Sequence, residues 1–585
     1  MPYSRRALSA KALGMLSVVV PTLAACSLGS GSSGCADQSI TVAVAPSIGP
    51  AIEQAARRYN AGASCARVTV RRQRPSEVAA NLSGQGSDPG AERPDAWIPD
   101  SSLWLPIARR TGAGAAVVRP SGASVAMSPL VLAVPRGHAP GTADWRLLLS
   151  HQLPGTGGAQ PPLRVRFLDP AAEATGLGAL LLAQNAAGSG KTGLATFAVT
   201  LYSDLGTALP DERSAYAEIA KGAASSPTGS SPTNPPVSSP TNPPRPTSRP
   251  TSRPPTAVVL SEQSVWQHGH TDATPPVTAL YPDGRTLALD FPYVSTTTDR
   301  KRSRTVEDFQ ATLAQSQTRV ALQGLGLRTP DGVAGTDFDE RYGVAARVPD
   351  RLPSPDPTNV GRVLQMWQRT VLGARMLILL DVSPSMADPV PQTQDTRMQA
   401  TAKVAVGGVH ILSDNSQVAL WEFATQLDGD RDYHQIVPFR TLSDRVGAGS
   451  QRNLLERSFA AAAPVPHTRT SLYDSVLAAY REAVRTYQPD HNNVVVLLTD
   501  GINYDPGRTI SLQTLLTELK RASDPMRPVT IVPIAFGPDI DPGSLQRIAA
   551  ATGGEAFVTL DPRQVQQVFL QMLIRLTCGQ TCPMS

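Results

Sequence analysis

The C-terminal part of the chain alternates nearly uninterrupted apolar runs with runs in which apolar residues recur at helical spacing. The strand-like runs are 376–380, 417–423, 494–498, 529–535 and 556–560. The helix-like runs are 399–412, 472–487, 512–522, 544–551 and 565–576. Strands that are apolar on both faces, such as VVVLL, are typical of a parallel sheet covered by helices on both sides. This part of the chain is therefore predicted to form a doubly wound, Rossmann-like α/β domain.

The N-terminal part shows a looser alternation of the same kind. Strand-like runs lie at 40–45, 68–72, 125–134 and 163–168, and a helix-like run covers 51–59. Alternating strands and helices again favour a layered α/β fold.

A tract of Ser, Thr and Pro occupies residues 225–256, where SPTNPP and TSRP each occur twice. Almost nothing in it can be buried, so burial cannot offset the entropy of ordering it, and an extended, disordered segment is predicted. After the tract, strand signals at 257–265 and 277–294 and one helix at 305–325 are too few to close a core. We therefore expect the tract to interrupt one domain that covers 36–335. The alternative is a linker between independent domains.

The beginning of the chain has the features of an export signal. Three basic residues precede an apolar run at 12–25, which is too short for a stable membrane anchor. The run ends in Leu-Ala-Ala-Cys26, which resembles the lipobox of bacterial lipoproteins. That resemblance implies a signal peptide that ends at residue 25, a lipid on Cys26, and a location on the outer face of the bacterial cytoplasmic membrane. The alternative is an ordinary secreted protein with a stray cysteine.

Charge and cysteine content refine this interpretation. Loss of the three basic residues lowers the formal net charge from +5 to +2, so a basic surface for nucleic acid is not supported. With Cys26 assigned to lipid, Cys35 with Cys65 and Cys578 with Cys582 remain as candidate disulfides in an oxidising compartment. For the last pair, two free thiols or a link to another chain remain open as alternatives.

Five segments of the N-terminal part follow one another in an order that resembles bacterial extracellular solute-binding proteins. They are SITVAVAPSIGPAIEQAARRYN, RPDAWIPDSSLW, SPLVLAVPRG, RFLDPAAEATGLGALLL and AVVLSEQSVW. The resemblance implies a two-lobed, periplasmic-binding-protein-like domain that holds a small-molecule solute between its lobes, at helix N-termini whose free N–H groups attract anions. Ser47 and Thr175, each just before a helical run, are therefore candidate solute contacts. As an alternative, each is simply a helix N-cap.

The sequence NAAGSGKT at 185–192 contains the ending of a phosphate-binding P-loop. Asn185, however, stands where the first glycine is required, and a helix-like run at 177–187 precedes the motif where a strand is required. A helix that ends in a turn at Gly188 is predicted instead.

Two carboxylates in the C-terminal part closely follow apolar strands. Asp381 ends LILLD and Asp500 ends VVVLLTD. The carboxyl ends of parallel strands meet near the switch point of a doubly wound sheet, so we expect these two side chains to lie close together. Ser383 and Ser385 add two hydroxyl oxygens on the loop after the first strand. An all-oxygen set with few formal charges suits Mg²⁺ or Mn²⁺.

The order of these motifs resembles that of von Willebrand factor A (VWA) domains. DVSPS at 381–385 matches the DxSxS motif, RTSLYDSV contributes Thr470 as the second element, and LLTDG contributes Asp500 as the third. The resemblance, over 364–578, implies a metal-ion-dependent adhesion site (MIDAS). In such a site the two serines and the threonine ligate the cation directly, and the two aspartates act largely through waters. One position stays open for a carboxylate of a protein partner. The alternative is the same fold with a hydrogen-bonded turn and no metal.

These observations lead to one main hypothesis and one alternative. The main hypothesis is a membrane-anchored, extracytoplasmic binding protein whose VWA domain takes a protein partner through a Mg²⁺-dependent site, with an adjoining solute-binding-like domain. The alternative is a solute receptor of an uptake system with the VWA domain as its docking module. No HExxH, GxSxG or paired histidine cluster occurs in the sequence, so an enzyme is not expected.

Overall fold

The computed structural model describes most of the two α/β parts of the chain. The described residues are 38–62, 65–86, 90, 92–138, 143–149, 163–204, 208–224, 254–282, 285–347, 349–504, 509–537, 540–559 and 571. The expected signal peptide, Cys26, Cys35, Cys578 and Cys582 lie outside these residues, as does nearly all of the Ser/Thr/Pro tract. Among the helices that the structure describes, none has the length and apolar character needed to cross a membrane.

The C-terminal domain is built on a six-stranded sheet with strand order β13-β12-β11-β16-β17-β18. Neighbouring strands are parallel except β12 and β13, which form an antiparallel edge. The strands are β11 (Ala374–Asp381), β12 (Gln417–Asp428), β13 (Arg431–Thr441), β16 (Asn492–Thr499), β17 (Thr530–Phe536) and β18 (Phe557–Thr559). A small separate ribbon is formed by β14 (Arg445–Val446) and β15 (Gly449–Ser450).

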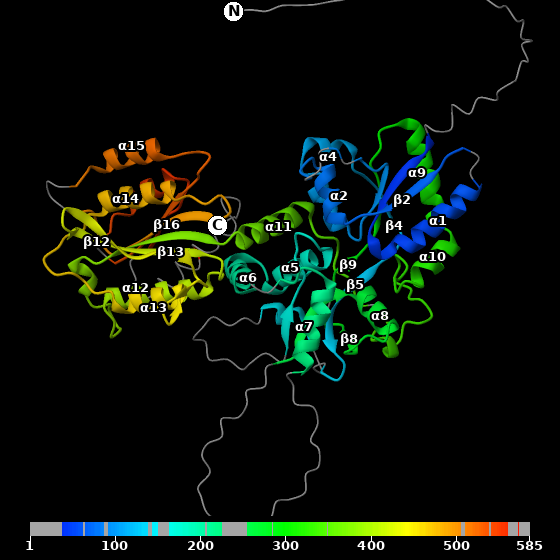
Figure 1. Ribbon diagram of the computed structural model, residues 1–585, viewed down its shortest axis with the longest axis horizontal. Coiled ribbons are helices and arrows are strands. Elements are labelled where there is room, and N and C mark those ends of the chain that lie inside the picture. Colours follow the sequence, from blue (N-terminus) through cyan, green and yellow to red (C-terminus); the bar gives the residue numbers. More distant parts are fainter. Residues whose placement is uncertain are drawn as a thin grey trace, which may run out of the picture.

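Helices cover both faces of this sheet (Figure 1). Alternate side chains of β11 explain why: Met376 and Leu380 pack into one apolar cluster with α12 and α13, whereas Leu377 and Leu379 pack into another with α14, α15 and α16. All eight residues of β11 are buried. The helices are α12 (Arg397–Ile411), α13 (Gln451–Ala461), α14 (Leu472–Arg485), α15 (Leu512–Ala522) and α16 (Pro542–Ala550). The predicted doubly wound α/β domain is confirmed.

Two elements of this domain do not follow from the apolar pattern. The edge strand β13 has a single buried residue among its eleven, so it lacks the continuous apolar run of the central strands. The helix α13 has only three buried residues among its eleven. The helix expected at 565–576 falls on residues of which only 571 is described.

The N-terminal domain contains two sheets, each flanked by helices (Figure 1). One sheet has the order β2-β1-β3-β10-β4 and the other β6-β7-β5-β8, with β9 beside β5. The strands are β1 (Ile40–Val44), β2 (Val68–Arg72), β3 (Ala96–Ile98), β4 (Arg119–Ser124), β5 (Ser128–Pro135), β6 (Arg164–Arg166), β7 (Thr256–Ser261), β8 (Val277–Leu280), β9 (Ala288–Leu289) and β10 (Pro292–Ser295). The chain passes from one sheet to the other between β4 and β5 and returns between β9 and β10. This is the predicted two-lobed architecture.

The helices of this domain pack on both sheets. They are α1 (Gly49–Gly62), α2 (Pro75–Leu82), α3 (Leu105–Ala108), α4 (Gly112–Val117), α5 (Ala174–Ala187), α6 (Gly190–Asp204), α7 (Glu212–Ala224), α8 (Glu262–His270), α9 (Arg300–Leu313) and α10 (Ser316–Gln323). Short 3-10 turns lie at η2 (Pro46–Ile48), η3 (Ser102–Trp104), η4 (Trp145–Leu149) and η5 (Glu340–Tyr342). The predicted end of a helix at Gly188 is confirmed, since this residue follows α5 with φ of 83°.

Two predictions for the segment after the tract are wrong. The strand expected at 257–265 ends at Ser261, whose side chain accepts a hydrogen bond from the Ser264 N–H and caps α8. The single helix expected at 305–325 is two helices, α9 and α10, separated at Ala314 and Gln315. The Thr318 hydroxyl donates to the Thr312 carbonyl at 3.1 Å and stabilises this turn.

Strands that come before and after the Ser/Thr/Pro tract in the sequence pair with each other in the same sheet. The tract lies between α7 and β7, and β7 pairs with β5 and β6, both of which precede the tract. Apolar residues of β5 and β7 also share one cluster.

One helix connects the two domains. α11 (Pro357–Val371) contributes Val363 and Trp367 to the apolar core of the N-terminal domain and is followed, after two residues, by β11. Trp367 Nε1 donates to Asp169 Oδ1 at 3.1 Å. At the other end of the helix, Asn492 Nδ2 of β16 donates to the Arg369 carbonyl at 2.6 Å. The expected start of the C-terminal domain at 364 lies inside this helix.

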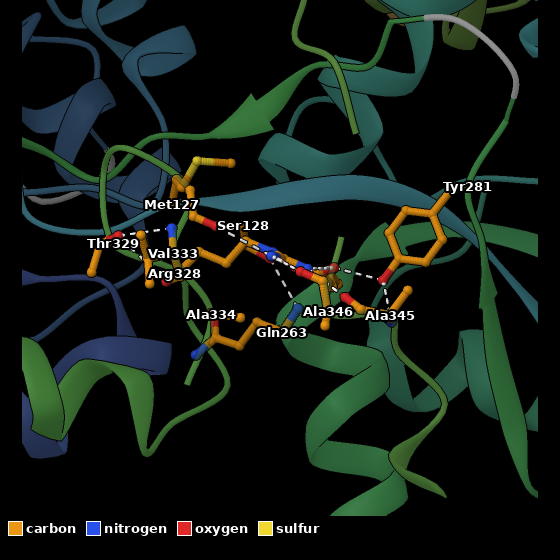
Figure 2. Close-up of polar contacts among 12 residues, drawn as sticks. Met127, Ser128, Gln263, Tyr281, Arg328, Thr329, Val333, Ala334, Ala345 and Ala346 are labelled. Atoms are coloured by element: carbon orange, nitrogen blue, oxygen red, sulfur yellow. Dashed lines mark hydrogen bonds and ion pairs between the residues drawn. The ribbon is translucent and has the colours of Figure 1, made fainter. Parts of the chain in front are cut away.

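A buried ion pair holds the segment after α10 against the N-terminal domain. Arg328 Nε and Nη2 donate to the two carboxylate oxygens of Glu262 at 2.7 and 2.8 Å, and both side chains are 0% exposed. The Tyr281 hydroxyl donates to the same carboxylate at 2.6 Å. Figure 2 shows Arg328 directed toward the carbonyls of Ala345 and Ala346, which accept at 2.6 and 2.9 Å. This network satisfies both charges and is structural.

Candidate cation site at the edge of the C-terminal sheet

The carboxyl ends of β11 and β16 form the edge at which the candidate residues meet. Asp381 is the last residue of β11, and Asp500 follows the last residue of β16. The two strands are parallel neighbours, with Leu380 opposite Leu498. The chain continues from β11 to one side of the sheet and from β16 to the other, so the edge between them is the topological switch point.

A chain of hydrogen bonds runs from one carboxylate to the other. Asp381 accepts from the Ser383 N–H at 2.9 Å and from the Thr499 hydroxyl at 2.6 Å. The Ser383 and Ser385 hydroxyl oxygens lie 3.2 Å apart, and the Ser385 hydroxyl donates to Asp500 Oδ1 at 2.9 Å. Asp381 and Asp500 are both 0% exposed. Four of the five expected site residues are therefore joined directly.

Thr470 lies beside the Asp500 end of this chain of hydrogen bonds. It is buried, and its carbonyl accepts from the Tyr504 N–H at 2.9 Å. A Cβ placed on Gly501 would lie 3.7 Å from the Thr470 hydroxyl oxygen, so this hydroxyl sits against the backbone that follows Asp500. The Asn503 side chain accepts from the N–H groups of Leu472 and Tyr473 and ties the same loop to the start of α14.

Sequence reasoning missed a residue of this site, Arg397. Its Nη1 donates to Asp500 Oδ2 at 2.8 Å, and its side chain is 9% exposed. A second, longer ion pair of 3.5 Å joins Arg397 to Asp388, whose side chain is 55% exposed. Arg397 is the first residue of α12 and lies outside the three motifs, 103 positions before Asp500, and nothing in its local pattern signals this contact.

Burial and mutual repulsion disfavour the ionised forms of the two carboxylates. Burial and then the charge of Asp500 raise the pKa of Asp381 to about 6. Burial also raises the pKa of Asp500, against the opposing effect of hydrogen bonds from Arg397 and Ser385. A bound cation would favour both ionised forms.

The donor set fits a hard divalent cation. The described residues contain no group of three or more His, Cys, Asp or Glu side chains that could hold a metal, so hydroxyl oxygens must complete any site here. Ser383, Ser385 and Thr470 supply such oxygens beside Asp381 and Asp500. Oxygen ligands with few formal charges suit Mg²⁺ or Mn²⁺ rather than a softer metal.

The two candidate solute contacts lie at starts of helices in the N-terminal domain, but neither is an N-cap. The cap of η2 is Ala45 and that of α5 is Glu173, so the N-cap alternative is wrong for Ser47 and Thr175. The Ser47 carbonyl accepts from Gln263 Nε2 at 3.2 Å. Thr175 is 5% exposed, and its hydroxyl has no hydrogen-bond partner within the described part of the chain.

Acidic groups surround the start of α5. Burial, followed by the charges of Asp100 and Glu212, raises the pKa of Glu173 to about 7. Burial raises the pKa of Asp100 to about 6, against a hydrogen bond from Trp104. In their ionised forms these carboxylates would repel an anion at this helix N-terminus, whereas their raised pKa values favour the neutral forms.

Cys65 is disulfide-bonded. Its expected partner, Cys35, is among the residues that the structure does not describe.

Comparison with known families assigns both domains. Residues 40–328 match the family described as bacterial extracellular solute-binding protein, and residues 376–571 match the von Willebrand factor type A domain. Two uncharacterized proteins of Mycobacterium tuberculosis, from strains CDC 1551 / Oshkosh and H37Rv, are each 23% identical over 532 residues. The match covers 88% of this chain and 73% of each relative.

Solved structures similar to the chain fall into the same two groups. A von Willebrand factor type A protein from Catenulispora acidiphila is 18% identical, with a TM-score of 0.28, and the match covers 35% of this chain and 43% of that one. Proximal thread matrix protein 1 from the mussel byssus, with a zinc-occupied MIDAS motif, is 16% identical, with a TM-score of 0.28 and coverages of 35% and 48%. The matches thus span less than half of either protein.

A periplasmic thiamin binding protein is similar to the N-terminal part, with 14% identity, a TM-score of 0.39, and coverage of 57% of this chain and 96% of that protein. The two α/β architectures are consistent with the two family matches. The chain therefore combines a solute-binding-like domain with a C-terminal von Willebrand factor A domain.

Proposed function

We propose that the C-terminal domain binds a protein partner through a divalent cation, Mg²⁺ or Mn²⁺. The cation is held by Asp381, Ser383, Ser385, Thr470 and Asp500. The observation that supports this most directly is the hydrogen-bond chain from Asp381 through the two serines to Asp500, which gathers two buried carboxylates and two hydroxyls from two strands at one edge.

In this proposal the bound cation supplies an open coordination position for a carboxylate of the partner. The residues of the chain prepare that position. Thr499 and the Ser383 N–H fix Asp381, and Ser385 fixes one oxygen of Asp500. Because these groups are already oriented, little rearrangement is needed when the cation enters.

The test is calorimetric titration of Mg²⁺ and Mn²⁺ into the full chain and its Asp381→Ala variant. We expect binding with the unchanged chain and none with the variant, because the variant loses a buried carboxylate at the centre of the donor set. Asp395→Asn is a matched control, since Asp395 pairs with Lys403 outside the site at 2.6 Å. Equal binding by the chain and Asp381→Ala would contradict the proposal.

The solute-binding family is extracellular, and we propose that the chain works outside the cytoplasm, attached through a lipid on Cys26 after removal of residues 1–25. Labelling with a fatty-acid analogue in bacterial cells tests this. The intact chain should take up the label and sediment with membranes, whereas Cys26→Ser should do neither.

A second candidate function is that of a solute receptor whose VWA domain docks onto an uptake system. The buried, unpartnered hydroxyl of Thr175 favours it, because a buried polar group usually has a partner and a solute could supply one. Native mass spectrometry of the purified chain should then detect a bound small molecule that Thr175→Val retains less well. Both matched families are binding domains rather than enzyme families.

The extents of the domains complete the proposal. We place the solute-binding-like domain at 36–335 with the tract 225–256 inserted, and the VWA domain at 364–578. Disulfides join Cys35 to Cys65 and Cys578 to Cys582. Mass mapping of peptides from the unreduced chain tests both pairs.

A further inference from the structure

A buried arginine shares the carboxylate of the candidate cation site. Arg397 Nη1 donates to Asp500 Oδ2 at 2.8 Å, while the Ser385 hydroxyl donates to the other oxygen, Oδ1, at 2.9 Å. The two oxygens of Asp500 therefore have different partners. One faces the hydroxyl cluster and the other faces a permanent positive charge.

The position of Arg397 is set by its surroundings on several sides. Its backbone N–H donates to the Asp388 carbonyl at 2.9 Å, and Thr396 caps α12 in a reciprocal arrangement with Gln399. A Cβ placed on Gly537 would lie 3.7 Å from the centre of the guanidinium, and the φ of Gly537 is 116°. Gly537 therefore lines one side of the guanidinium at van der Waals distance, in a backbone conformation that favours glycine.

The arginine lowers the net negative charge around a cation bound at this site. Asp381 and Asp500 carry two negative charges when both are ionised, and Arg397 compensates one of them within hydrogen-bond distance. Asp388 also approaches Arg397, but it is 55% exposed, so water screens its charge. The set of hydroxyls and carboxylates therefore attracts a divalent cation less than the two carboxylates alone would.

We propose that Arg397 sets the affinity of the cation site through the positive charge that it places on Asp500. It holds Asp500 with Oδ1 toward the hydroxyl cluster, and its charge weakens binding of the cation alone. A cation held by so little negative charge remains attractive to the carboxylate of a partner, so the partner strengthens cation binding. This inference rests on the proposed cation-dependent function.

The test is titration of Mg²⁺ and Mn²⁺ alone into the full chain and into Arg397→Met, which keeps an extended apolar stem and removes the charge. Removal of a positive charge close to a divalent cation in a partly buried site should tighten binding by about tenfold or more. Arg397→Lys keeps the charge and should bind no more tightly than the unchanged chain. Electron paramagnetic resonance of Mn²⁺ gives an independent readout of the bound fraction.

The outcomes separate this inference from the function on which it rests. Tighter binding by Arg397→Met, or binding that becomes measurable only in that variant, supports the role of Arg397, provided that adding Asp381→Ala removes the binding. If the unchanged chain and Arg397→Met bind equally, or if Arg397→Met binds more weakly with an unchanged melting temperature, the inference is wrong while the cation site stands. If neither chain binds in a manner sensitive to Asp381→Ala, the proposed function fails.

Discussion

Two buried arginine–carboxylate pairs in this chain serve different ends. In the N-terminal domain, Glu262 and Arg328 are both 0% exposed, and backbone carbonyls accept the donors that the carboxylate does not use. In the C-terminal domain, Asp500 and Arg397 lie at the carboxyl edge of a sheet, beside a second buried carboxylate, Asp381. The first pair is closed and balanced. The second has an excess of negative charge and hydroxyl oxygens beside it, which supports the proposed cation site.

The largest expected effect is at the Arg328–Glu262 pair of the N-terminal domain. Arg328→Met leaves Glu262 buried without its partner, so the free energy of unfolding should fall by about 3–5 kcal/mol. Chemical denaturation of the full chain, followed domain by domain, measures it. The double variant with Glu262→Gln should recover part of the loss, and binding of Mg²⁺ should stay unchanged in both. A single variant as stable as the unchanged chain would mean that water reaches Glu262.

The acidic groups near α5 give a third case, in which burial is only partial. The pKa of Glu173 is raised from 4.5 to about 7, so the folded state holds this proton more tightly than the unfolded state. The resulting stabilisation is present below pH 4.5 and is lost as the pH rises to about 7. Glu173→Gln should reduce the change in the free energy of unfolding across this pH window. The reduction should be only on the order of 1 kcal/mol, because solvent screens the partly exposed carboxyl group. Unfolding titrations at several pH values measure the slope, and an unaltered slope would contradict the assignment.

The smallest expected effect is at Asp388, on the solvent-exposed side of the Arg397–Asp500 pair. Asp388 is more than half exposed and lies 3.5 Å from Arg397. Asp388→Asn should change the free energy of unfolding by less than about 0.5 kcal/mol. It should also leave the affinity for Mg²⁺ within about twofold, since a screened charge contributes little. A large change in affinity would place the controlling charge at Asp388 rather than at Arg397.

Much of the C-terminal fold follows from local patterns. The runs LILLD and VVVLL are apolar on both faces, and such strands have a stable place only in the middle of a covered parallel sheet. Once the strands are placed in such a sheet, their carboxyl ends must lie at the same edge of the sheet. The residues that follow each strand then become candidates for a shared site. Thr470 could be found only through the similarity of its motif to a family, because it follows no strand of the sheet.

The sequence by itself therefore determined the two α/β domains and the oxygen-bearing residues at the sheet edge, because hydrophobic periodicity and strand ends are local properties of the chain. Only the tertiary structure decided which charges meet. Arg397 reaches Asp500 across 103 positions of sequence and Arg328 reaches Glu262 across 66. An arginine at the start of a helix looks the same whether it faces water or a buried carboxylate. The packing of distant elements sets that difference, and the local pattern does not record it.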